Sequence, residues 1–227
     1  MPEPNRLRFG PAPGAADNPF RPTGNVARFE LEPYYINGQP DGDVTNTGGY
    51  LANRVEVYDR IATRATPAAD WPDPVGSTRW YSFSIYIPPD FPEGTPTQWF
   101  DFVQWKGLNT GSPPVAMEIR GSQFVLGGKN SDQHLGSIDP GQWTHFVIGL
   151  HFSDRPTTGW ATAYRDNTRV VNHVPTQTMN DYTASSGATE VDPNYLKMGI
   201  YRSVTWTVTQ VIYLSRMTIG KTLASVS

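Results

Sequence analysis

Short stretches of alternating apolar and polar residues, separated by turn residues, run through most of this chain. Successive side chains of a β-strand point to opposite faces, so the alternation predicts strands with one buried face. Prolines between residues 72 and 96 exclude long helices from that region. The expected strands are Val26–Leu31, Asn53–Arg60, Thr78–Ile87, Thr97–Lys106, Val115–Arg120, Gln123–Gly127, Trp143–Phe152, Gly159–Arg165, Thr168–Val174, Tyr195–Arg202 and Thr207–Ile219. Many short strands with regular turn signals predict an all-β sandwich or jelly roll.

Four of these strands combine an apolar face with a face rich in hydrogen-bonding side chains. The polar faces carry Arg54, Glu56 and Tyr58; Gln104 and Lys106; Glu118 and Arg120; and Tyr195, Lys197 and Tyr201. Exposure to solvent alone would explain a polar face. However, amide, tyrosine and arginine side chains are typical of a surface that binds a ligand through hydrogen bonds. If the four strands are neighbours in one sheet, we expect them to form one groove.

Length and composition indicate one domain. The 227 residues suit a single all-β domain. Residues 1–25 are rich in Pro, Gly and Asn, and we expect an irregular N-terminal arm there, followed by one domain over 26–227. The net charge of −3 and the lack of a basic run argue against nucleic acid as a partner. No apolar run has the length of a membrane span, and the absence of cysteine excludes disulfides.

Three motifs resemble those of β-jelly-roll polysaccharide lyases. The segment Tyr195-Leu-Lys-Met-Gly-Ile-Tyr201 resembles the YxKxGxY strand of jelly-roll alginate lyases. Gln104-Trp-Lys106 is similar to the QWH strand of glucuronan lyases and heparin lyase I-like enzymes, and Arg54-Val-Glu56 resembles the start of the RxExR strand. The motifs occur in the family's order, and flanking phrases such as Gly141-Gln-Trp143 also fit the glucuronan and heparin lyase I-like group.

The resemblance implies a two-sheet, concanavalin A-like β-jelly roll with a concave substrate groove. It implies β-elimination on a uronic-acid polysaccharide, which leaves a 4,5-unsaturated uronate, with glucuronan or a related β-linked glucuronate chain ahead of alginate. We expect a secreted monomer, although Met1-Pro-Glu-Pro-Asn5 has no apolar signal-peptide stretch. No cofactor is required. The loop from Asp41 to Asn46 offers oxygen ligands for a structural Ca²⁺, but a turn is the simpler interpretation.

The resemblance also assigns residue roles. Gln104, Lys106 and Arg54 would neutralise the substrate carboxylate. Tyr201 corresponds to the family's catalytic tyrosine, which would remove the C5 proton and protonate O4. The other expected substrate-binding residues are Lys197, which would lower the pKa of Tyr201, together with Tyr195, Arg120, Tyr58, Glu56 and Arg202. Glu56 and Glu118 are expected to form salt bridges that hold Arg54, Arg120 or Lys197. No metal ligand is predicted.

Two departures from the family pattern leave alternatives open. Lys106 stands where the family usually has His, and Tyr58 replaces the second Arg of RxExR. The first alternative is a carbohydrate-binding module of the same fold that has lost catalysis. The second is a jelly-roll glycoside hydrolase with two catalytic carboxylates, although its usual ExDxxE signature is absent from this sequence.

Overall fold

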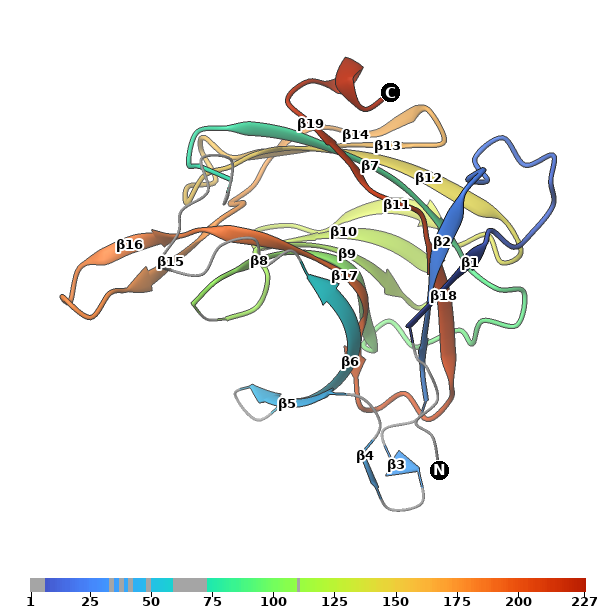
Figure 1. Ribbon diagram of the computed structural model, residues 1–227. Helices are drawn as coiled ribbons and strands as arrows, with labels where there is room; N and C mark the ends of the chain where they lie inside the picture. The colour runs from blue at the N-terminus through green and yellow to red at the C-terminus, as the bar shows by residue number, and fades with distance from the viewer. Residues whose placement is uncertain are drawn as a thin grey trace.

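The structure is a computed structural model. It describes the side chains of residues 7–32, 54–57, 73–109 and 111–227, and the backbone alone of 35–36, 39–40, 43–47, 50–53 and 58. Two large antiparallel sheets pack face to face (Figure 1). The two-sheet, all-β sandwich predicted from the sequence is therefore confirmed.

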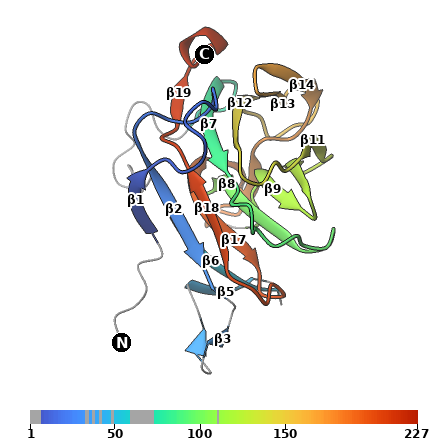
Figure 2. The same cartoon turned by 90° about the vertical axis from the view of Figure 1, so that its right-hand side faces the viewer.

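The first sheet has eight strands. Its order is β1-β2-β18-β7-β12-β13-β14, and β19 also pairs with β7. Figure 2 shows β2 running between β1 and β18. The strand bounds are β1 Leu7–Pro11, β2 Asn25–Leu31, β7 Thr78–Tyr86, β12 Trp143–His151, β13 Trp160–Arg165, β14 Thr168–Pro175, β18 Gln210–Leu214 and β19 Thr218–Gly220.

The second sheet has seven strands in the order β11-β10-β9-β8-β17-β6-β5. Its bounds are β5 Asp43–Thr47, β6 Tyr50–Tyr58, β8 Trp99–Gly107, β9 Val115–Arg120, β10 Gln123–Gly128, β11 Gln133–Ser137 and β17 Asn194–Ser203. The sheet curls strongly from β17 through β6 to β5 (Figure 1). The four strands predicted to share a groove are β9, β8, β17 and β6, and they are consecutive neighbours here.

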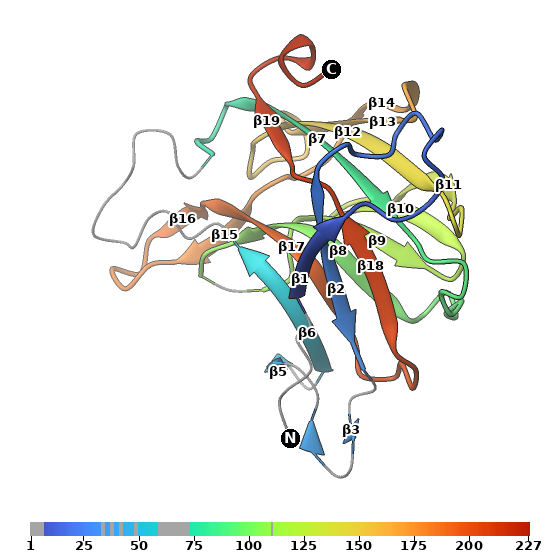
Figure 3. The same cartoon turned by 45° about the vertical axis from the view of Figure 1, so that its right-hand side comes forward.

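Short elements complete the fold. β3 (Tyr35–Ile36) pairs with β4 (Gln39–Pro40), β15 (Asn180–Thr183) pairs with β16 (Thr189–Asp192), and a 3₁₀ turn, η1, spans Leu223–Ser225. The β15–β16 hairpin extends beyond one end of the seven-stranded sheet, directly before β17 (Figures 1 and 3). Over the described residues, no helix has the length and apolar character needed to cross a membrane.

Aromatic pairs that bridge the two sheets fill the core. Phe83 of β7 meets Phe102 of β8 edge to face, with ring centroids 6.4 Å apart. Phe124 of β10 meets Phe146 of β12 at 5.2 Å in the same geometry. These four side chains are at most 1% exposed. Each buried aromatic ring removes a large apolar area from water, so the pairs fix how the sheets stack.

The structure corrects three expectations about elements. The N-terminal arm is not irregular throughout, because Leu7–Pro11 forms edge strand β1, where a proline without an N–H group is tolerated. The predicted strand Thr207–Ile219 is two strands, β18 and β19, separated by residues 215–217. The weakly alternating strands β11, β15 and β16 were missed because their faces are mostly exposed.

Candidate active site

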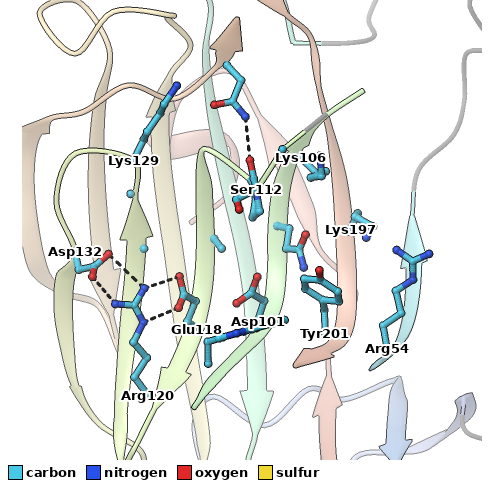
Figure 4. Close-up of a pocket in the computed structure, with 18 of the residues that line it drawn as sticks. Arg54, Asp101, Lys106, Ser112, Glu118, Arg120, Lys129, Asp132, Lys197 and Tyr201 are labelled. Carbon is cyan, nitrogen blue, oxygen red and sulfur yellow. Dashed lines mark hydrogen bonds and ion pairs between the residues drawn. The ribbon is translucent and has the colours of Figure 1, made fainter. Parts of the chain in front are cut away.

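A cavity of about 890 Å³ lies on the face of the seven-stranded sheet that points away from the core. Its floor is formed by side chains of β6, β8, β9 and β17, and β10 and the β15 end of the hairpin contribute to its rim. The floor residues are Arg54, Trp99, Asp101, Gln104, Lys106, Ala116, Glu118, Arg120, Lys197 and Tyr201. Figure 4 shows the labelled members pointing into one space. The predicted groove therefore exists.

β17 supplies the central pair, Lys197 and Tyr201. They lie on the same face because their positions in the strand differ by four, an even number, and Ile200 between them is fully buried in the core. The Lys197 ammonium lies 5.5 Å from the centre of the Tyr201 ring. Trp99 packs against the other side of the site, with its ring centroid 4.8 Å from that of Tyr201. The pair thus places a phenol beside a cation on a packed surface.

Glu56 fixes two of the predicted site residues. Its Oε2 accepts a hydrogen bond and ion pair from Lys197 Nζ at 2.6 Å, and its Oε1 accepts a hydrogen bond from Gln104 Nε2 at 3.2 Å. Strand register explains the meeting, because Lys197 lies opposite Gln104 on β8, and Gly199 lies opposite Glu56 on β6. The predicted salt bridge between Glu56 and Lys197 is confirmed.

Gly199 allows the close approach of β17 and β6 at this point. Its φ of +141° lies in a region that L side chains rarely adopt. A Cβ atom there would lie 2.3 Å from the Val55 carbonyl oxygen and 2.8 Å from the Cα of Glu56. The glycine of the YxKxGxY motif is therefore required by backbone packing next to Glu56.

Lys106 lies at the upper end of the same face, half-buried, opposite Tyr195 of β17. Its Nζ donates a hydrogen bond to the Gly107 carbonyl oxygen at 3.2 Å. Burial lowers the pKa of the Lys106 ammonium, Asp192 counteracts this effect, and Lys197 adds to the lowering. The residue in place of the family histidine is therefore easier to deprotonate than an ordinary lysine.

Arg120 is held by two carboxylates. Its Nε and Nη2 donate to the Glu118 carboxylate at 2.7 and 3.0 Å, and Nη1 forms an ion pair with Asp132. Gly127 of β10 makes room for this cluster, because a Cβ atom there would lie 2.0 Å from Glu118 Oε1. The predicted Glu118–Arg120 salt bridge is confirmed. Arg120, expected to bind substrate, lines the cavity, but its positive charge is already paired with these two carboxylates.

Three predicted binding residues with described side chains are not among those that line the cavity: Glu56, which holds Lys197 and Gln104, Tyr195, which lies opposite Lys106, and Arg202. The predicted substrate-binding role of Arg202 is wrong. Its side chain is fully buried on the core side of β17, where it donates to the Val208 carbonyl oxygen and to Gln210. Alternation along the strand explains this, because its neighbour Tyr201 faces the cavity. The side chain of Tyr58 lies outside the described residues.

The sequence analysis missed Asp101 because of a β-bulge. The register against β9 shifts between Asp101 and Val103, so both Phe102 and Val103 face the core, and Asp101 turns into the cavity. Phe102 and Val103 are two consecutive apolar residues between polar Asp101 and Gln104. They break the alternation of the strand, and this break is the one sign of the bulge in the sequence of this strand. Burial, followed by the nearby Glu118 and Glu56 carboxylates, raises the pKa of Asp101 well above its usual value.

The candidate calcium loop, Asp41–Asn46, is not a simple turn, because residues 43–46 belong to strand β5; its side chains lie outside the described residues. Over the side chains that are described, no group of three or more His, Asp or Glu residues is arranged to hold a metal ion.

Comparison with known proteins places this chain in a family. A family model described as "Polysaccharide lyase" matches residues 28–218. The fold is similar to that of an endo-β-1,4-glucuronan lyase from the fungus Trichoderma reesei, with a TM-score of 0.60 and 14% identity over 100% of this chain and 94% of that one. It is also similar to the alginate lyase AlgAT5 of polysaccharide lyase family 7, with a TM-score of 0.56 and 12% identity over 88% and 80% of the two chains.

A second family 7 alginate lyase, A1-II′, has a TM-score of 0.55 and 14% identity over 94% of this chain and 92% of that chain. A search of curated protein sequences finds no significant match. The structural similarities confirm the predicted jelly-roll fold. Because the family model spans most of the sequence, the chain belongs to the polysaccharide lyase family and is an enzyme of that class.

Proposed function

We propose that this lyase cleaves a uronic-acid polymer by β-elimination and prefers glucuronan or a related β-linked glucuronate chain. The observation that carries the proposal is the convergence of an amide, cations and a tyrosine on one cavity floor: Gln104, Arg54, Lys106, Lys197 and Tyr201. The preference for glucuronate rests on the Gln104-Trp105 dipeptide and its flanking phrases, and the fold shared with a glucuronan lyase agrees with it.

The reaction makes three demands on the site. The C5 proton next to a carboxylate is weakly acidic, so the negative charge of the carboxylate must be neutralised. A base must remove this proton, and an acid must protonate the O4 leaving group. Enolate-type charge develops on the carboxylate, so donors aimed there stabilise the transition state more than the bound substrate.

Gln104, Arg54 and Lys106 supply the neutralising groups in this proposal. The Gln104 amide is oriented by its hydrogen bond to Glu56, and its second N–H remains a donor for the substrate. Arg54 offers a planar guanidinium that suits a carboxylate. Lys106 adds a positive charge at the position of the family histidine.

Tyr201 is the proposed base and acid. A tyrosine ionises near pH 10 unless cations stabilise its phenolate, and the Lys197 ammonium beside the ring provides this stabilisation. After the phenolate takes the C5 proton, the phenol can deliver it to O4 on the same face of the sugar. One residue would then serve both steps of a syn elimination.

The ultraviolet absorbance of the unsaturated product tests the reaction. The enzyme is incubated with glucuronan, alginate, heparin, hyaluronan and pectate in parallel. A rise with glucuronan, faster than with alginate, is the expected result. A flat trace on every polyuronate would contradict the proposal, and a rise with alginate alone would overturn the substrate preference.

Substituting tyrosines on the two sheets tests the role of Tyr201. Tyr201→Phe should reduce kcat by about 10²- to 10⁴-fold while retaining polymer binding, because only the proton-transferring oxygen is lost. Tyr164→Phe makes the same chemical change on β13, where Tyr164 packs against Trp80 outside the cavity, and it should keep full activity. Full activity of Tyr201→Phe would refute the mechanism.

A further inference from the structure

Asp101 is a buried carboxyl group that faces the cavity. The residue is 6% exposed and lines the cavity floor. Within the described part of the chain, no hydrogen bond or ion pair reaches its carboxyl group. Figure 4 shows it between Glu118 and Tyr201, in agreement with the register, which places Asp101 opposite both residues.

The charged groups around Asp101 disfavour a second negative charge. Glu118 lies on β9 and Glu56 on β6, and both are carboxylates. The cations that face Asp101 are already engaged, because Arg120 is bonded to Glu118 and Asp132, and Lys197 is bonded to Glu56. Burial and the two carboxylates therefore outweigh the attraction of these cations, and the site favours the protonated form of Asp101.

A protonated carboxyl group has an O–H donor that needs an acceptor. The Glu118 carboxylate, the nearest anionic acceptor by register, already accepts two hydrogen bonds from Arg120, and none from Asp101 is present among the described residues. Because Asp101 lines the cavity, a molecule bound there can supply the acceptor. An anionic oxygen is the best acceptor for such a donor, since hydrogen bonds to charged groups are shorter and about twice as strong as neutral ones.

We infer that Asp101, carrying its proton, donates a hydrogen bond to the carboxylate of the uronate bound in the cavity. The inference rests on the proposed function, because that function supplies the uronate. Asp101 and Gln104 are successive cavity-facing residues of β8, separated by the bulge, so both reach the same group. As enolate charge develops on that carboxylate, the Asp101 hydrogen bond strengthens and supports the elimination.

This arrangement makes uronate binding depend on pH. If Asp101 of the free enzyme has lost its proton, binding of the uronate must take up a proton to form the hydrogen bond. Affinity therefore falls as pH rises through the pKa of Asp101. The other groups that face Asp101 are Tyr201, Lys197, Glu56, Glu118 and Arg120, and the experiment must separate their titration from that of Asp101.

The test measures binding of a glucuronan tetrasaccharide to the Tyr201→Phe enzyme, which removes both turnover and the tyrosine titration. Calorimetry in two buffers of different ionisation enthalpy, from mildly acidic to mildly alkaline pH, gives affinity and proton uptake. The Tyr201→Phe enzyme, which is the parent of the variants below, should take up a proton on binding and bind more weakly at higher pH. Adding Asp101→Asn, whose amide still donates but does not titrate, should remove this uptake and retain affinity at low pH.

Two further variants sharpen the test. Asp101→Leu removes the donor and should weaken binding by about 10- to 100-fold. Asp73→Asn is the matched control, because Asp73 is a carboxyl group whose pKa is also raised by burial, but it is bonded to Tyr81 and Arg79 outside the cavity. It should leave proton uptake unchanged. Melting curves verify that each variant is folded.

The outcomes separate the two proposals. If Asp101→Asn keeps the pH dependence of the parent, or Asp101→Leu binds as tightly as the parent, the role of Asp101 is refuted while lyase activity on glucuronate stands. If the wild-type enzyme neither cleaves nor binds any glucuronate polymer, the proposed substrate is wrong, and the inference about Asp101 fails with it.

Discussion

Removing one partner of the Lys197–Glu56 ion pair should destabilise the enzyme far more than replacing both partners together. The two side chains are 7% and 5% exposed, and their charged atoms lie 2.6 Å apart. Each charge has given up its hydration and relies on the other. A single substitution removes the opposite charge from a buried ion, whereas a double substitution leaves no charge at this pair.

The expected magnitudes follow from this burial. Lys197→Met or Glu56→Gln alone should cost about 3–5 kcal/mol. For a chain of this size, that corresponds to a fall in Tm of about 6–20 °C. The double variant keeps an amide oxygen at position 56 for the Gln104 hydrogen bond and should lose less than about 2 kcal/mol. The coupling energy is the sum of the two single losses minus the loss of the double variant, so it should be at least about 4 kcal/mol.

Urea unfolding followed by circular dichroism gives the four free energies of this double-mutant cycle. The control is Arg155→Met, because the Arg155–Asp154 pair spans 3.9 Å and the arginine side chain is 76% exposed; its loss should cost less than about 1 kcal/mol. Additive losses, with the double variant as unstable as the sum of the single variants, would refute the reasoning, since they would mean that neither charge depends on the other.

Two further predictions concern the backbone and the buried acid of the site. Gly199→Ala should lower the free energy of unfolding by about 3 kcal/mol or more and reduce activity, because its Cβ would meet the β6 backbone at 2.3 and 2.8 Å and its φ is +141°. The control is Gly24→Ala, which has open space around it and should cost less than about 1 kcal/mol. Thermal melting compares the two variants, and equal losses of stability would contradict the packing argument. Asp101→Asn should gain stability relative to the wild type as pH rises above about 4, by up to about 1.4 kcal/mol per pH unit. The reason is that the raised pKa of Asp101 makes the folded wild type bind more protons than the unfolded chain, so the wild type loses stability as pH increases. A difference in melting temperature that does not grow with pH would show that Asp101 ionises normally.

The sequence alone determined the strands of the site and which of their side chains share a face. Alternation is a local property of extended backbone, so it is readable in β6, β9 and β17 without knowledge of their neighbours. It correctly grouped Lys197 with Tyr201 and Glu118 with Arg120 on the cavity face. The sequence analysis kept the adjacency of these strands as a condition for the groove, and the sheet order meets this condition.

Only the tertiary structure decided those features of the site that depend on how strands and loops contact one another. The bulge in β8 depends on its register with β9: alternation counted back from Gln104 and Lys106 would put Asp101 on the core side, whereas the structure places it in the cavity. Arg120 was expected to bind substrate, but its guanidinium forms ion pairs with both Glu118 and Asp132, and Asp132 comes from the loop after β10. Arg202 is buried because it faces the core and finds acceptors at Val208 and Gln210. Each of these outcomes depends on contacts between residues of different strands and loops, and such contacts leave little trace in a local pattern.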